Sequence, residues 1–301
     1  MHLKLTQLEQ AFNSSTLTRI NDGLLDQYDV ELWIKRDDLL HPVISGNKWR
    51  KLKYVLDDVL SSGLSTIVSM GGAYSNHLHA LAYAGHALQL NTFGFIRGEQ
   101  PEVLNPTLLE MRDWGMTLKF VSRVDYRSFR NTNPSSVIPD LAPHHYWLPE
   151  GGATILALKG VSELVHEIDM SYDTLCAPCG TGTTLAGIIN ASAQEIAVLG
   201  FSALKNSEYL TSDVKKLLIS DGANWQIIRD YHFGGFAKVN DELMAFIENF
   251  EQRTSIPLDP IYTGKMMYGL YDLIKMQYFK PGHRIIALHT GGLQGKRGFG
   301  L

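Results

Sequence analysis

Short apolar runs alternate along the whole chain with helical patterns and turn signals, and this order constrains the fold more than any other feature. Most of the short runs are uninterrupted rather than alternating, which is typical of strands that are buried on both faces. Apolar residues with helical spacing are clearest just after Trp49. The order predicts an α/β fold with parallel sheets flanked by helices. We expect strands at 32–35, 66–70, 92–96, 117–121, 174–177, 196–201, 226–229 and 284–289, and helices at 52–60, 156–168, 185–190, 243–250 and 267–276.

Composition excludes several classes of partner. The 301 residues include 27 Lys and Arg against 31 Asp and Glu, a formal net charge of −4, so the chain lacks the basic footprint of a protein that binds nucleic acid or an anionic membrane. No apolar run reaches the roughly 20 residues of a membrane helix. Two cysteines and the lack of an apolar signal core predict a cytoplasmic protein. Because a single core rarely grows beyond roughly 250–300 residues, we expect two subdomains, or one large domain with an insertion.

Lys48 follows Ser-Gly-Asn immediately before the amphipathic pattern that starts near Trp49. The amino terminus of a helix disfavours an ammonium group, because the helix dipole is positive there and N–H groups are unpaired. This position therefore keeps an amine nucleophilic. The alternative is a solvated basic face, since Arg50, Lys51 and Lys53 form a charge cluster with Lys48.

A second segment, residues 71–77, links an expected strand to a helical run through Gly-Gly-Ala-Tyr-Ser-Asn-His. Ser75 is a candidate helix cap, and the N–H groups that follow it suit an anion such as a substrate carboxylate. A plain strand-to-helix connection is the alternative. His77 and His79 are two positions apart and do not face each other on a helix, so we expect no shared metal.

A third segment, residues 179–184, reads Cys-Gly-Thr-Gly-Thr-Thr between an expected strand and helix. Its small residues leave backbone amides free to wrap a phosphate, but it lacks the residues of a dinucleotide fingerprint and of a nucleotide P-loop. A terminal phosphomonoester fits best. The competing interpretation is a redox pair, since Cys176 and Cys179 form a Cys-x-x-Cys motif.

The last third of the chain adds two hydroxyl groups. Tyr262 precedes a helical pattern, and a tyrosine there can donate or accept a proton. Thr290 follows an expected strand, and the carboxyl ends of strands in open α/β sheets face the ligand crevice. For each of them, the alternative is a hydrogen-bonded structural role.

Together these segments resemble the fold type II pyridoxal phosphate enzymes, in the branch that contains D-cysteine desulfhydrase and 1-aminocyclopropane-1-carboxylate deaminase. Six ordered motifs carry the resemblance: Lys-Arg-Asp-Asp at 35–38, Ser-Gly-Asn-Lys at 45–48, the segment 71–77, Pro-Glu-Gly-Gly at 149–152, Asp-Pro-Ile-Tyr-Thr-Gly-Lys at 259–265 and His-Thr-Gly-Gly at 289–292. The resemblance implies two open, twisted, mostly parallel sheets as in the tryptophan synthase β subunit. It also implies a large domain of residues 1–49 and 148–301, a small inserted domain of residues 50–147, and a homodimer.

The resemblance also implies roles for residues at matching positions. Lys48 forms the Schiff base with pyridoxal 5'-phosphate and moves the proton at the substrate Cα, Asn76 bonds the ring phenolic oxygen, and Thr290 faces the pyridine nitrogen. Tyr262 assists as an acid or base, and Ser75 takes the substrate carboxylate. The cofactor phosphate lies on Gly180, Thr181, Gly182, Thr183 and Thr184, and the substrate contacts Ser75, Asn76, His77, Phe236 and Tyr262.

The implied activity is β-elimination on D-cysteine or another β-substituted D-alanine. Deaminases of this branch resemble one another in having Glu after the tyrosine and Leu at the position of Thr290, whereas this chain has Thr263 and Thr290. The cyclopropane deaminase is the first alternative. Phe236 stands where the family has a second active-site tyrosine, and a phenyl ring transfers no proton, so a pyridoxal phosphate binding protein with a degenerate site is the second.

Overall fold

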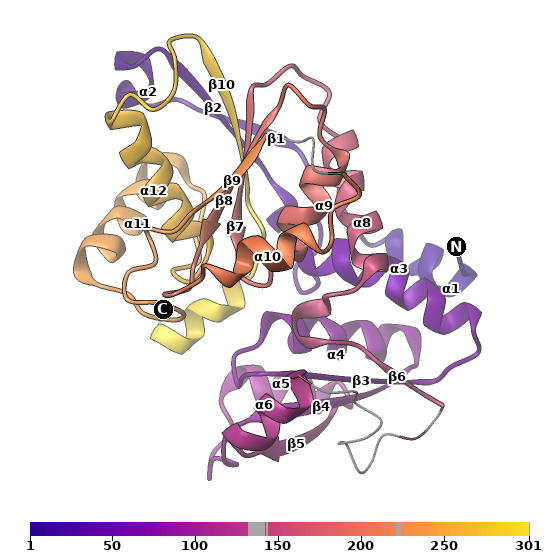
Figure 1. The fold of residues 1–301 in the computed structure, drawn as a ribbon. Helices are drawn as coiled ribbons and strands as arrows, with labels where there is room; N and C mark the ends of the chain where they lie inside the picture. The colour runs from indigo at the N-terminus through magenta and orange to yellow at the C-terminus, as the bar shows by residue number, and fades with distance from the viewer. Residues whose placement is uncertain (132–141, 143, 221–223, 301) are drawn as a thin grey trace.

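The computed structural model describes residues 1–131, 142, 144–220 and 224–300, which form two sheets flanked by helices (Figure 1). The larger sheet has the order β1-β2-β10-β7-β8-β9, and its neighbours are parallel except for β1 and β2. The smaller sheet, β5-β4-β3-β6, is parallel throughout. The predicted fold class is confirmed. The strands are β1 Leu17–Ile20, β2 Val30–Lys35, β3 Thr66–Gly71, β4 Asn91–Arg97, β5 Thr117–Val121, β6 His145–Trp147, β7 Thr174–Cys179, β8 Ala197–Ser202, β9 Trp225–Ile228 and β10 His283–Leu288.

Helices cover both faces of each sheet. In the larger sheet, α11 and α12 pack on one face and α8 and α9 on the other (Figure 1). In the smaller sheet, α3 and α4 pack on one face and α6 on the other. The helices are α1 Leu3–Glu9, α2 Gly23–Gln27, α3 Asn47–Ser61, α4 Asn76–Leu88, α5 Pro106–Asp113, α6 Arg123–Asn131, α8 Ile155–His166, α9 Thr183–Ala191, α10 Tyr209–Lys215, α11 Asp241–Thr254 and α12 Thr263–Lys275, with short 3-10 helices η1 Asp37–Leu39, η2 Glu150–Gly152 and η3 Leu293–Phe299. None of these helices is long and apolar enough to cross a membrane.

The eight expected strands are all present, with ends within two residues of the predicted ones. β1 and β6 were not predicted, because a four-residue antiparallel edge strand and a three-residue strand leave too short a pattern to separate from a loop. The Asn/Pro/Ser-rich stretch 130–139 predicts a loop at the surface. Arg130 belongs to α6 instead, and residues 132–139 lie outside the described residues. The predicted domain boundaries and homodimer stay predictions.

Three strand ends position the site. β3 ends at Gly71, β7 at Cys179 and β10 at Leu288, and each is followed directly by a segment that the sequence singled out. Ligands of parallel α/β sheets bind beyond the carboxyl ends of the strands. The central strand β7 is buried over its whole length, so the loop that follows it starts from a rigid support.

Candidate active site

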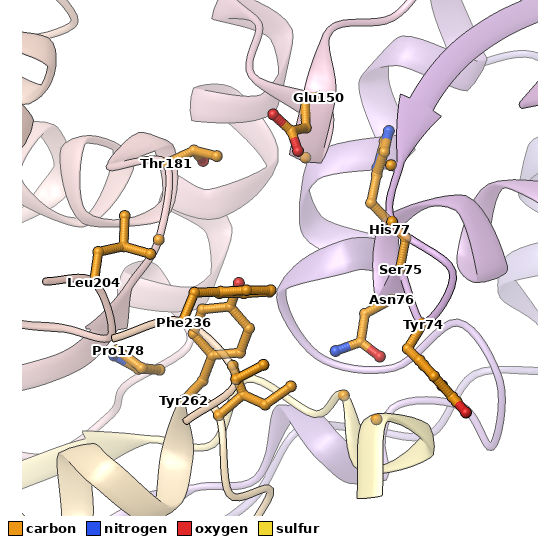
Figure 2. Close-up of a pocket in the computed structure, with 18 of the residues that line it drawn as sticks. Tyr74, Ser75, Asn76, His77, Glu150, Pro178, Thr181, Leu204, Phe236 and Tyr262 are labelled. Atoms are coloured by element: carbon orange, nitrogen blue, oxygen red, sulfur yellow. The ribbon is translucent and has the colours of Figure 1, made fainter. Parts of the chain in front are cut away.

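A cavity of about 760 Å³ lies beyond the carboxyl ends of β3, β7 and β10. Figure 2 shows Ser75, Asn76 and His77 on one wall, and Thr181, Phe236 and Tyr262 on the wall that faces it. Of the predicted site residues, Thr183 alone does not line the cavity, and its buried hydroxyl lies 3.2 Å from the hydroxyl of Thr181. The structure brings together Lys48, Ser75, Asn76, His77, Gly180, Thr181, Gly182, Thr184, Phe236, Tyr262 and Thr290.

Lys48 is the second residue of α3 and projects into this cavity. The preceding Gly46 has φ +60°, and a Cβ there would lie 1.9 Å from the carbonyl oxygen of Thr290, so only glycine allows this approach. The Asn47 N–H donates to the same carbonyl at 3.2 Å. The side-chain amine of Lys48 forms no hydrogen bond or ion pair with the described residues. Burial lowers its pKa to about 8, although the negative charge of Asp259 acts to raise it. The amine is therefore available for chemistry.

The neighbours of Lys48 are not a solvated basic face, so that alternative is wrong. Arg50 and Lys51 are only 4% and 3% exposed. Arg50 bonds both carboxylate oxygens of Asp37 at 3.0 and 3.1 Å and also bonds Glu167. Lys51 Nζ donates to the Gly151 carbonyl at 3.0 Å, and burial together with the charge of Lys48 holds the pKa of Lys51 well below its usual value. These buried contacts hold the first two turns of α3 in place.

The segment after β7 is an uncovered helix start. Gly182, at φ +78°, precedes α9, and no side chain caps its first N–H groups. A Cβ on Gly180 would lie 3.1 Å from the Tyr262 ring, so glycine lets the ring lie against the backbone. Thr184 Oγ1 accepts from Asn47 Nδ2 at 3.2 Å, and Lys51 Nζ lies 3.4 Å from Thr181 Oγ1. Free N–H groups, hydroxyls and a nearby lysine make a site suited to a phosphate.

The opposite wall is the start of α4. Ser75 Oγ accepts from the Leu78 N–H at 3.2 Å, which confirms the predicted cap. Asn76 Oδ1 accepts from the side-chain amide of Gln294. His77 Nε2 lies 2.8 Å from Ser69 Oγ, and burial together with the charges of Lys48 and Lys51 holds its pKa well below its usual value. His77 is therefore neutral at pH 7.

Tyr262 precedes α12, as predicted, and Asp259 positions it. The carboxylate of Asp259 accepts from the Tyr262 N–H at 2.8 Å and from the hydroxyl of Thr263 at 2.7 Å. Thr263 is fully buried and does not line the cavity, so of the two threonines only Thr290 faces the site. Burial, with the negative charge of Asp259, raises the pKa of Tyr262 and keeps its phenol protonated. Phe236 is 47% exposed, and its ring lies edge-on to the ring of Tyr262 with 6.1 Å between the ring centroids.

The two cysteines contradict the redox alternative. Both are free and buried, and they occupy positions i and i+3 of β7, whose side chains point to opposite faces. Cys176 packs in the core under α11 and α12, whereas Cys179 packs in the core under α9. Burial raises the pKa of Cys179 to about 11, so its thiol stays protonated and unreactive.

Several charged residues of the cavity were not predicted from the sequence. Arg97 ends β4, Arg123 and Arg130 lie in α6, and all three line the cavity together with Glu150. Glu150 belongs to the Pro-Glu-Gly-Gly motif, so the sequence contained a motif from which it could have been predicted as a site residue. The arginines are spread over more than 30 positions without a motif, so only the packing of α6 beside β4 brings them to one site.

Comparisons with known proteins agree with this geometry. Residues 14–291 match the family model described as pyridoxal-phosphate dependent enzyme. The chain is 31% identical over 293 residues to a mitochondrial bifunctional D-cysteine desulfhydrase/1-aminocyclopropane-1-carboxylate deaminase of Arabidopsis thaliana, covering 88% of this chain and 73% of that protein. It is 33% identical to a putative 1-aminocyclopropane-1-carboxylate deaminase of Pyrococcus abyssi, covering 88% and 86%. A crystal structure of an ACC deaminase homologue superposes with TM-score 0.80 at 26% identity, covering 100% and 98%.

Proposed function

The chain belongs to the pyridoxal-phosphate dependent enzymes, and from this premise we propose that it catalyses β-elimination on D-cysteine. D-Cysteine and one water would give pyruvate, ammonia and hydrogen sulfide. The observation that carries the proposal is one cavity that combines the unpaired Lys48 amine, the uncapped start of α9 and the hydroxyl of Thr290. The names of the relatives support the substrate class.

The residues of the cavity fit pyridoxal phosphate. Lys48 offers an amine with a lowered pKa for a covalent bond to the cofactor aldehyde. Gly180 and Gly182 carry no side chain that would come between the start of α9 and a bound phosphate. By the family resemblance, Asn76 bonds the ring hydroxyl and Thr290 faces the pyridine nitrogen. When bound, the cofactor withdraws electrons from the substrate Cα.

The chain's own residues then handle protons and orientation. The start of α4, with Ser75 and its N–H groups, binds the substrate carboxylate. The Lys48 amine takes the proton from Cα, which it can do near neutral pH because its pKa is about 8. The phenol of Tyr262, kept protonated by burial, donates a proton to the departing sulfur.

Ring opening of 1-aminocyclopropane-1-carboxylate is the second candidate, because both reactions stand in the name of the Arabidopsis relative. Two features of the cavity favour elimination instead. Thr290 replaces the leucine of the deaminases, and Phe236 replaces a phenol that could assist ring opening. The same phenyl ring motivates the third candidate, a protein that binds the cofactor without turnover.

The test uses the protein saturated with pyridoxal phosphate, offered D-cysteine, L-cysteine and 1-aminocyclopropane-1-carboxylate in parallel. We expect sulfide and pyruvate from D-cysteine, and neither product from the Lys48→Ala variant. Release of 2-oxobutanoate from the cyclopropane substrate at a higher kcat/KM would favour the deaminase. Bound cofactor without any product from a panel of D- and L-amino acids would favour the binding protein.

A further inference from the structure

Positive charge collects around the cavity although the chain as a whole is acidic. Among the described residues, six basic side chains line it against one carboxylate, that of Glu150, whereas the whole chain has a net charge of −4. A cofactor phosphate and a substrate carboxylate account for Lys51 and the two helix starts, which leaves the arginines in excess. The six basic residues are Lys48, Lys51, Arg97, Arg123, Arg130 and Lys238. Burial lowers the pKa of the two lysines Lys48 and Lys51.

Four arginines form a cluster where the smaller sheet meets the cavity. Arg123, Arg127 and Arg130 are spaced by four and three residues, which places them on one face of α6. With Arg97 at the end of β4 they line a hollow of about 430 Å³, which shares Arg97, Arg123 and Arg130 with the main cavity. All four are exposed. We call these four residues the arginine cluster.

The cluster has a buried aromatic floor and, in the part of the chain that the structure describes, one carboxylate partner. The buried Tyr126 lies beneath it, with the guanidinium of Arg97 5.7 Å from the centre of its ring. The Tyr126 hydroxyl donates to Glu150 at 2.6 Å, and the same carboxylate pairs with Arg130 at 3.0 Å. Among the described residues, the side chains of the other three arginines have no hydrogen-bond or ion-pair partner. Like charges held together repel, so an anion that enters the hollow relieves a cost already present in the fold.

We propose that the arginine cluster binds an anionic group on the side chain of the substrate, so that the enzyme prefers β-substituted D-alanines whose leaving group is an oxyanion such as phosphate. This inference rests on the proposed β-elimination. For O-phospho-D-serine, the Cα–H bond breaks and its proton goes to the Lys48 amine. The Cβ–O bond then breaks with its electron pair leaving on phosphate, and the remaining enamine takes up water to give pyruvate and ammonia.

Turnover by the enzyme saturated with pyridoxal phosphate is compared for O-phospho-D-serine and for β-chloro-D-alanine, which has an uncharged side chain. We expect the wild type to favour the phosphate substrate in kcat/KM. Arg123→Gln should lower the ratio of the two kcat/KM values about tenfold, since one charge-assisted hydrogen bond is lost. Arg112→Gln, which removes an exposed arginine of α5 outside the cavity, should leave the ratio unchanged. An equal ratio in all three proteins overturns the inference.

Binding is measured separately from turnover, by calorimetry with the unreactive D-2-amino-3-phosphonopropionate and the uncharged D-2-aminobutyrate. We expect the phosphonate to bind more tightly, to lose this advantage in Arg123→Gln, and to be displaced by inorganic phosphate. Equal affinity for the two analogues overturns the inference, and so does phosphate that binds beside the phosphonate without displacing it. Charge-selective binding without turnover of β-chloro-D-alanine means that the elimination is wrong and the anion site stands. Turnover of β-chloro-D-alanine without selective binding of the phosphonate means that the elimination stands and the anion site is wrong.

Discussion

Two parts of the cavity are suited to anions, and they differ in how they are built. The loop after β7 offers backbone N–H groups from Gly180 to Thr184, fixed by a fully buried strand and by the start of α9. The arginine cluster offers long, exposed side chains on α6 and at the end of β4. Fixed dipoles in a buried loop suit a group that stays bound, whereas exposed charges on long side chains suit one that exchanges on each turnover. This difference supports our proposal that the cofactor phosphate binds at the loop and the side chain of the substrate at the arginine cluster.

The largest expected effect concerns Lys48, which lines the same cavity as the loop after β7 and the arginine cluster. Lys48→Ala removes the amine that we place at the aldehyde and at the substrate Cα, so release of sulfide from D-cysteine should fall by about 10³-fold or more. Phosphate affinity at the loop should persist, because the loop itself is unchanged. Sulfide release and binding of the cofactor measure the two effects. Full activity in this variant would remove the amine from the mechanism.

The next prediction compares a buried ion pair with an exposed one. Asp37→Ala deletes a buried partner of Arg50, so the free energy of unfolding should fall by about 3 kcal/mol. The matched control is Asp113→Ala, which breaks an exposed pair with Arg112 and should cost less than about 0.5 kcal/mol. Urea unfolding of both variants gives the comparison. Equal losses would show that burial does not set the strength of these pairs.

Backbone geometry at the loop is tested by Gly182→Ala. Alanine at φ +78° is strained, and its Cβ would lie 2.8 Å from Val214, so the loop must shift and cofactor affinity should fall about tenfold. Gly63→Ala has the same strain, at φ +68°, but meets no atom within 4 Å and lies outside the cavity. It should lower stability without changing cofactor affinity. Titration of both variants with pyridoxal phosphate separates the two effects.

The pKa of Lys48 predicts how cofactor uptake depends on pH. Only the neutral amine reacts with an aldehyde, and with a pKa of about 8 its neutral fraction rises about fivefold from pH 7 to pH 8 and levels off above pH 9. A lysine in water would keep rising beyond pH 10. The rate of uptake by the cofactor-free protein is followed by visible absorbance, with N-acetyl-lysine as the reference amine. A rate that continues to rise to pH 10 would contradict the lowered pKa.

The smallest expected effect is that of salt, and it sharpens the contrast between the two anion sites. Raising ionic strength from about 0.05 M to about 0.5 M shortens the screening length to a few ångströms, so exposed charges weaken more than buried dipoles. Affinity for D-2-amino-3-phosphonopropionate should fall about threefold, while cofactor affinity changes less. An equal loss of affinity at both sites would mean that exposed side-chain charges hold the cofactor phosphate at the loop as well.

A structural feature could be predicted from the sequence when it depends on residues that are close together in the chain. Buried strands such as β3 and β7 were predictable because an uninterrupted apolar run fits a strand covered on both faces. The cap at Ser75 and the start of α3 beside Lys48 were predictable for the same reason, since caps and turns depend on adjacent residues. β6 was not, because three residues carry no period.

The sequence by itself determined the α/β class, the loops at the carboxyl ends of strands and the family, since each lies in contiguous residues. Only the tertiary structure decided which side chains meet. It left Thr183 outside the cavity, made Arg50 and Lys51 buried rather than solvated, and brought Arg97 to the face of α6. Burial and long-range pairing depend on how the sheets and helices pack, and that packing is not encoded in any single segment.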